Sequence, residues 1–129
     1  MRVRLFATLF LLLTSSVTAL AQNLPLLSTW KNEGGSLLTV WWISGDSFRG
    51  TFTNFAPGFQ CQGIPYPAVG SVKPNGALLF TVTFTNCNTV TNWHGRLLGN
   101  QMPTRWKLVY SDSNGHFQKL YGKNLFVRQ

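Results

Sequence analysis

Acidic residues are almost absent from this chain of 129 residues, which has eleven Lys and Arg but only three Asp and Glu. The three are Glu33, Asp46 and Asp112, and each stands among turn-forming residues, without a second carboxylate nearby in the sequence. The two histidines are equally isolated, with His94 at an outward strand position and His116 in a turn. General acid–base and metal-assisted catalysis need such groups in clusters. We therefore expect neither an enzyme nor a metal site.

Long apolar runs are also missing. The run from Leu5 to Leu13 is shorter than the roughly 20 residues that a membrane-spanning helix needs. Two arginines precede it, and Ala19-Leu20-Ala21 follows it as a cleavage site of small residues. This arrangement is typical of a secretory signal peptide. We expect residues 1–21 to be that signal, residues 22–129 to form one domain, and the protein to be secreted or periplasmic with no membrane partner.

Cysteine occurs only twice, as Cys61 and Cys87. Two free thiols rarely persist outside the cytosol, so we predict one disulfide, which would stabilise the fold by roughly 3 to 4 kcal/mol in the chain-entropy model. A metal site with these cysteines is disfavoured, because neither histidine stands at the spacing of a zinc finger. The disulfide would tie the longest connection, from Phe55 to Tyr66, to the connection that holds Cys87. The pinned loop is therefore a candidate lid.

Helical periodicity is missing from Ser28 onward. β-branched and aromatic residues dominate, and turn residues recur about every ten positions, which is typical of all-β sandwiches and barrels. Eight consecutive strands with short connections fit an antiparallel up-and-down β-barrel. We expect the strands over residues 28–33, 36–44, 47–55, 66–73, 77–86, 91–99, 103–112 and 117–128.

The positive charge is spread thinly. Without the two arginines of the signal, nine basic and three acidic residues remain, a net charge of +6. Such a surface attracts polyanions. The basic residues stand singly, however, and many occupy outward strand positions, so a solvated barrel exterior explains them better than a nucleic-acid site.

Alternation along the strands predicts which side chains face the barrel interior. It places Val40 and Trp42 inside and Trp41 outside, where an exposed indole indicates a subunit interface. A barrel of eight strands can enclose one small ligand. Because the inward polar residues are uncharged, we expect a neutral, hydrogen-bonding and partly apolar guest. These residues are Asn32, Ser36, Asn54, Thr89, Thr91 and Asn124.

Several short motifs occur in a distinctive order, namely Trp30–Ser36 (WKNEGGS), Gly50–Phe52 (GTF), Thr91–Gly95 (TNWHG) and Trp106–Leu108 (WKL). Together they resemble the motifs of the avidins, the biotin-binding barrels. The segments around Cys61 and Cys87 are similar to the disulfide-bearing loops of short, dimeric avidins. The resemblance covers residues 28–128 and implies high-affinity binding of biotin inside the barrel, with no further cofactor.

The resemblance also implies a role for each site residue. Asn32 and Ser36 would donate hydrogen bonds to the ureido oxygen of biotin, and Asn54 and Asn124 would accept from its two ureido N–H groups. Thr91 would meet the ring sulfur. Thr89 would meet the carboxylate, helped by backbone N–H groups of residues 55–58. The other expected contacts are Phe84, Trp93, Trp106 and Leu108 as walls around the rings.

Two substitutions depart from the family pattern. Phe52 replaces a tyrosine that would be a third donor to the ureido oxygen, a loss of about 1 to 3 kcal/mol. Phe84 replaces a tryptophan of the wall. In addition, no tryptophan near His116 and Phe117 could be lent to the pocket of a neighbouring subunit. These departures predict weaker binding than in the tightest family members.

The partners expected from the sequence are biotin or biotinylated molecules, and further copies of the chain in a homodimer or higher homo-oligomer. No specific nucleic-acid partner is expected. Two alternative functions stay open. One is an avidin-like barrel that binds a different small ligand, which Phe52 and Phe84 would favour. The other is a cationic barrel that binds anionic polymers on its outside.

Overall fold

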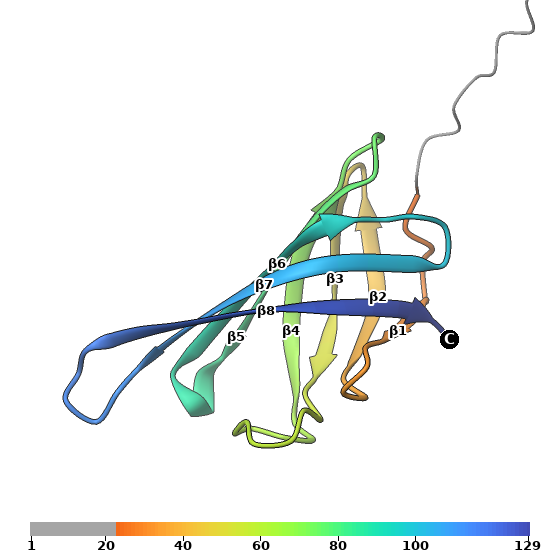
Figure 1. Ribbon diagram of the computed structural model, residues 1–129. Coiled ribbons are helices and arrows are strands. Elements are labelled where there is room, and N and C mark those ends of the chain that lie inside the picture. Colours follow the sequence, from red (N-terminus) through yellow and green to blue (C-terminus); the bar gives the residue numbers. More distant parts are fainter. Residues whose placement is uncertain (1–22) are drawn as a thin grey trace, which may run out of the picture.

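The computed structural model describes residues 23–129, so the signal peptide expected at residues 1–21 lies outside the described range. The described chain forms a closed barrel in which consecutive strands pair antiparallel and the last strand returns to the first (Figure 1). The predicted up-and-down barrel is thereby confirmed. The strands are β1 (Thr29–Lys31), β2 (Leu37–Ser44), β3 (Ser47–Thr53), β4 (Pro65–Val72), β5 (Ala77–Phe84), β6 (Thr89–Arg96), β7 (Gln101–Ser111) and β8 (Phe117–Arg128).

The inward side chains change character along the strands and divide the barrel into two ends. Along β3 the apolar Phe48 comes before the polar Asn54, which follows the strand, whereas along β8 Asn124 comes before Phe126. Since β3 and β8 run in opposite directions, apolar side chains gather at one end and polar ones at the other. We call these the core end and the pocket end. The largest fully buried side chains of the core end are Trp30, Leu38, Phe80, Leu97, Met102 and Phe126.

Aromatic packing joins the two ends. On β5, Phe80 is fully buried and stacks on Trp93 of β6, with ring centroids 4.7 Å apart and planes 9° from parallel. Trp93 also lies 4.8 Å from the ring of Phe52 on β3. Burial of such rings stabilises the barrel at about 25 cal/mol per Å² of apolar surface. Phe52 and Trp93, but not Phe80, also line the cavity at the pocket end.

A β-bulge in β2 overturns one inward assignment. Val40 pairs with Gly50 but Trp42 pairs with Arg49, so Trp41 is an additional residue and the alternation changes phase there. The prediction that Trp42 faces inward is wrong: its side chain is 39% exposed and lies under the Arg49 guanidinium, 5.1 Å from the ring centroid. Trp41 is 48% exposed, as its outward assignment requires. Strict alternation cannot reveal an inserted residue.

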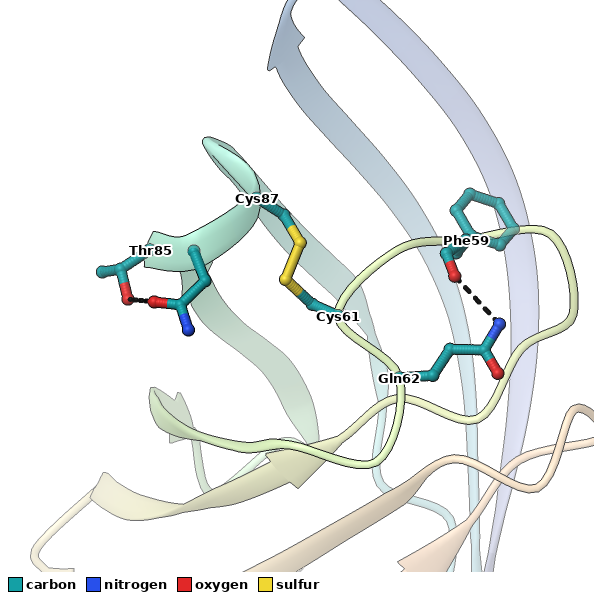
Figure 2. Close-up of a disulfide and its surroundings, with 6 residues drawn as sticks. Phe59, Cys61, Gln62, Thr85 and Cys87 are labelled. Atoms are coloured by element: carbon teal, nitrogen blue, oxygen red, sulfur yellow. Dashed lines mark hydrogen bonds between the residues drawn. A yellow bond between two sulfur atoms is a disulfide. The ribbon is translucent and has the colours of Figure 1, made fainter.

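The strand expected over residues 77–86 ends early, at Phe84, and gives way to the 3-10 helix η1 (Thr85–Cys87). Asn88 then adopts a left-handed conformation with φ of 50°, which turns the chain into β6. Figure 2 shows how the Cys61–Cys87 disulfide ties the loop between β3 and β4 to η1. The predicted disulfide is confirmed. Across residues 23–129 no helix is long and apolar enough to cross a membrane.

Candidate ligand-binding site

The pocket end holds a cavity of about 550 Å³. This volume lies within the range of small-molecule sites, roughly 300 to 1,000 Å³. Every residue for which the sequence predicted a ligand contact lines this cavity, although the contacts themselves stay a prediction. These residues are Asn32, Ser36, Phe52, Asn54, Phe84, Thr89, Thr91, Trp93, Trp106, Leu108 and Asn124.

Asn32 is held by the tight turn between β1 and β2. Its Oδ1 accepts hydrogen bonds from the backbone N–H groups of Gly34, at 3.1 Å, and Ser36, at 3.0 Å. The turn needs a positive φ of 84° at Gly35, which glycine adopts without strain. Because Oδ1 is occupied within the turn, the amide Nδ2 of this buried side chain is the group available to a ligand. The turn therefore presents a preorganised donor.

Ser36 and Asn54 form a donor–acceptor pair across the pocket end. The Ser36 hydroxyl accepts from the backbone N–H of Phe55 at 2.9 Å and donates to Asn54 Oδ1 at 3.1 Å. Asn54 Oδ1 also accepts from the backbone N–H of Ala56 at 3.0 Å. These bonds fix the hydroxyl and the amide oxygen beside each other. A ligand with an adjacent acceptor and donor could pair with both groups at once.

Asn124, on β8, links the cavity to the carboxylate of Glu33. Its Oδ1 accepts from the indole Nε1 of Trp93 at 2.9 Å, and its Nδ2 donates to Glu33 Oε1 at 2.7 Å. The other carboxylate oxygen, Oε2, accepts from the backbone N–H of Leu125 at 2.8 Å. Partial burial raises the pKa of Glu33, but hydrogen bonds from Asn124, Leu125 and its own backbone outweigh this and hold the pKa below its usual value. Glu33 is therefore ionised at neutral pH.

Aromatic rings wall the cavity between these polar groups. Phe52 and Phe84 pack edge to face, with centroids 6.0 Å apart, and the Phe52 ring also lies 4.8 Å from the ring of Trp93. On the opposite side Phe59, from the disulfide-tied loop, stands edge-on to Trp106 at 6.3 Å. Trp106 fits there because Gly122 lies across from it on β8, where even a Cβ atom would collide with the indole. The walls suit a flat, partly apolar ring system.

Strand register brings the threonines of β6 to the same cavity. Thr91 pairs with Leu108 and Thr89 with Tyr110 on β7, so each hydroxyl lies beside an apolar or aromatic neighbour. Thr91 is buried and Thr89 is half-buried. Hydroxyls can donate or accept, so this side of the cavity can satisfy polar ligand atoms of either kind.

Nine further residues line the cavity without having been predicted as side-chain contacts, although Ala56 and Gly58 belong to the loop whose backbone N–H groups were expected to help bind the carboxylate. Leu120 shares the inward parity of Asn124 and Phe126, so extension of the alternation by two residues would have found it. The loop residues follow no alternation, and only the predicted disulfide and the family resemblance, which implied backbone contacts from residues 55–58, suggested that this loop lies near the site. Nothing in the sequence singles out Lys123. The nine are Ala56, Gly58, Phe59, Gln60, Cys87, Tyr110, Ser111, Leu120 and Lys123.

Backbone hydrogen bonds hold three of the polar side chains of the cavity, those of Asn32, Ser36 and Asn54. Between residues 23 and 129 no cluster of three or more His, Cys, Asp or Glu could hold a metal ion. Fold and cavity together define a class: an antiparallel β-barrel with an internal cavity that could hold a small, hydrogen-bonding ligand.

Comparison with known proteins gives this class a name. The model of the Avidin family matches residues 20–129, and the chain belongs to that family. Afifavidin from Afifella pfennigii is 41% identical over 101 residues, which make up 71% of this chain and 63% of afifavidin. The chain thus spans less than two thirds of the length of that relative.

Solved structures of avidin-like proteins are similar in fold as well as in sequence. The bradavidin2–biotin complex is 52% identical, with a TM-score of 0.78 over 82% of this chain and 99% of bradavidin2. A complex of short afifavidin with biotin is 37% identical, with a TM-score of 0.70 over 79% of this chain and 87% of that protein. Apo shwanavidin is 32% identical, with a TM-score of 0.73 over 84% and 98% of the two chains.

Proposed function

We propose that the protein binds biotin, non-covalently and without catalysis, in the cavity at the pocket end. The observation that carries this proposal is that Asn32, Ser36, Asn54 and Asn124 gather around one cavity that aromatic rings enclose. Two similar avidin-like proteins, bradavidin2 and short afifavidin, have structures described as biotin complexes. A cyclic urea fused to an apolar ring matches both parts of the lining.

The urea of biotin places a carbonyl directly beside an N–H group, and the Ser36–Asn54 pair complements that arrangement. In the proposed complex the Ser36 hydroxyl turns from Asn54 Oδ1 to the ureido oxygen, and the freed Oδ1 accepts from the adjacent ureido N–H. Asn32 Nδ2 donates to the same ureido oxygen. Several donors fixed by backbone bonds polarise that oxygen and strengthen each hydrogen bond beyond a neutral pair.

The second ureido N–H would donate to Asn124 Oδ1. A carbonyl oxygen accepts two hydrogen bonds, so Oδ1 can keep its bond to Trp93 Nε1 while it binds the ligand. Thr91 would then contact the ring sulfur and Thr89 the carboxylate. The walls would be Phe84, Trp93, Trp106 and Leu108, with Phe52 below them.

Phe52 makes the proposed site weaker than a site with a third donor. Its ring is buried and provides no hydroxyl, so the ureido oxygen would receive two side-chain hydrogen bonds instead of three. The cross-strand neighbour Tyr66 has a buried hydroxyl that lacks a hydrogen-bond partner in the described part of the chain. That hydroxyl does not line the cavity and so does not substitute directly.

We further propose that the mature protein is secreted or periplasmic and forms a homodimer or higher homo-oligomer. The disulfide supports export, because such bonds persist in oxidising compartments. The adjacent exposed indoles of Trp41 and Trp42, on the outside of β2, support a subunit contact there. Replacement of Trp41 by Glu should then shift the elution volume toward the monomer, whereas an unchanged volume would count against this contact.

Isothermal titration of the purified protein with biotin tests the proposed function. We expect saturable heat with one site per chain, and a higher melting temperature in the presence of biotin. Biotin methyl ester should bind more weakly, because it removes the charge expected at Thr89. If high micromolar biotin gave neither heat nor a thermal shift, the proposed function would be wrong.

A further inference from the structure

A side-chain amide is a donor at one end and an acceptor at the other, so its orientation decides what it can bind. Asn124 lies at the cavity wall, with one half of its amide facing Trp93 and the other half facing Glu33. If the amide were rotated by 180°, this part of the cavity would present a donor instead of an acceptor. A ureido N–H would then meet another N–H, and the hydrogen bond would be lost.

Glu33 fixes the orientation of the Asn124 amide, although Glu33 itself does not line the cavity. Its two carboxylate oxygens accept from two different groups, Asn124 Nδ2 at 2.7 Å and the backbone N–H of Leu125 at 2.8 Å. The backbone donor is fixed by the pairing of β7 with β8, in which Leu125 lies opposite Pro103. A carboxylate has only acceptors, so the group facing its other oxygen must be a donor. The amide nitrogen of Asn124 therefore points outward and its oxygen inward.

We propose that Glu33 is a positioning residue that makes this side of the cavity selective for ligands with an N–H group. Glu33 orients the Asn124 amide through both of its carboxylate oxygens. The inference rests on the proposed function for the identity of the ligand. The orientation of the amide can be tested without any ligand.

Replacement of Glu33 by Gln would create a conflict that the carboxylate avoids. The introduced amide has one acceptor, and the backbone N–H of Leu125 requires it. Its nitrogen would then face Asn124, which could satisfy that nitrogen only by turning its own oxygen outward. The Asn124 nitrogen would in turn face the Trp93 indole N–H, which is also a donor. The variant must either leave donors unpaired or present a donor to the cavity.

The same logic predicts a rescue. Asn124→Asp alone would set two carboxylates against each other, with no hydrogen between them. In the double variant Glu33→Gln/Asn124→Asp, the introduced amide could serve Leu125 with its oxygen and the new carboxylate with its nitrogen. The other carboxylate oxygen would again accept from Trp93 and from the ligand. Two unfavourable changes should therefore compensate each other.

The test is a double-mutant cycle measured by titration with biotin. We expect each single substitution to raise the dissociation constant about tenfold or more, and the double variant to return to within about threefold of wild type. Asp112→Asn is the matched control. Asp112 accepts comparable hydrogen bonds from the backbone N–H groups of Asn114 and His116, but in the β7–β8 turn. This control variant should bind biotin as wild type does.

Two results would overturn the inference. One is a Glu33→Gln variant that binds biotin within about twofold of wild type. The other is a double variant whose loss equals the sum of the two single losses, since independent residues show such additivity. The melting temperature of each variant would show whether that variant is folded.

A ligand-independent measurement separates this inference from the proposed function. The indole N–H proton of Trp93, assigned by comparison with Trp93→Phe, should shift in the NMR spectrum of Glu33→Gln, because the Asn124 oxygen would no longer face it. An unchanged resonance in Glu33→Gln would contradict the orienting role even if the protein binds biotin. If the wild-type protein did not bind biotin, the proposed function would be wrong. The shift of the Trp93 resonance in Glu33→Gln would still show whether Glu33 orients the Asn124 amide.

Discussion

The core end and the pocket end of the barrel are built from the same strands, but their inward side chains differ: those at the core end pack against each other, and those at the pocket end surround a cavity. At the core end, Phe80 and Phe126 are fully buried and their rings pack edge to face, which stabilises the fold. At the pocket end, Ser36 and Asn54 have hydrogen bonds directed by the backbone, and they leave a cavity. The comparison teaches that a single alternating pattern can stabilise a fold with one half of each strand and bind a ligand with the other.

The largest effect should come from the core end. Phe80→Ala removes a fully buried ring that stacks on Trp93, and we expect a loss of about 3 to 5 kcal/mol in the free energy of unfolding. Denaturant unfolding followed by tryptophan fluorescence would measure this. The control is Leu79→Ala on the same strand, whose side chain is 39% exposed and which should change stability by less than about 1 kcal/mol. Equal losses in the two variants would contradict the division into two ends.

Removal of the disulfide should have the next largest effect and involve the pocket end. The double variant Cys61→Ser/Cys87→Ser opens a cross-link between residues 26 positions apart, with an expected loss of about 3 kcal/mol in the chain-entropy model. Since Phe59 lines the cavity from the freed loop, biotin should also dissociate faster. Stopped-flow displacement of a fluorescent biotin would report this rate. An unchanged dissociation rate would show that the loop does not act as a lid.

A change at the pocket end itself should affect binding more than folding. Ser36→Ala removes the hydroxyl that pairs with Asn54 and should weaken biotin binding by about 1 to 3 kcal/mol, or roughly 5- to 150-fold. Ser47→Ala, at an exposed position at the start of β3, is the control and should leave the titration unchanged. If Ser36→Ala bound biotin as tightly as wild type, the proposed donor to the ureido oxygen would be wrong.

The substitution Phe52→Tyr adds a hydrogen-bonding group to a buried apolar side chain that lines the cavity. The added hydroxyl would supply the third donor, and we expect biotin affinity to rise by up to about tenfold, equivalent to one hydrogen bond. Tyr66→Phe is the matched control on the adjacent strand. It removes a buried hydroxyl that does not line the cavity, so affinity should not change. Titration of both variants with biotin would distinguish the two positions.

The smallest effect should be the pH dependence contributed by Glu33. Its pKa is lowered in the folded barrel, so the ionised form is stabilised by folding. That contribution is present above the unfolded-state pKa, near 4.3, and disappears as the pH falls through the folded value. Wild type should therefore lose stability more steeply than Glu33→Gln below about pH 4.3. Thermal unfolding across this range would test it, and parallel curves for the two proteins would contradict it.

The sequence revealed the barrel more fully than the details of its interior. Alternation predicted all eight strands, and it brought Thr89 and Thr91 to the same cavity as Trp106. It failed at Trp42, because an inserted residue changes the phase of a strand without any change in composition. It also did not find Phe59, because a loop has no periodicity to read. The partner of Glu33 on β8 lies 91 positions away in the sequence, and only the closure of the barrel brings the two together.

A crystal structure of the protein with biotin tests the central claim most directly. The claim predicts the ureido oxygen at about 3 Å from both Asn32 Nδ2 and Ser36 Oγ, with the two ureido N–H groups directed at Asn54 Oδ1 and Asn124 Oδ1. If biotin bound elsewhere on the barrel, or lay in the cavity with its urea turned away from these four side chains, the account would be contradicted.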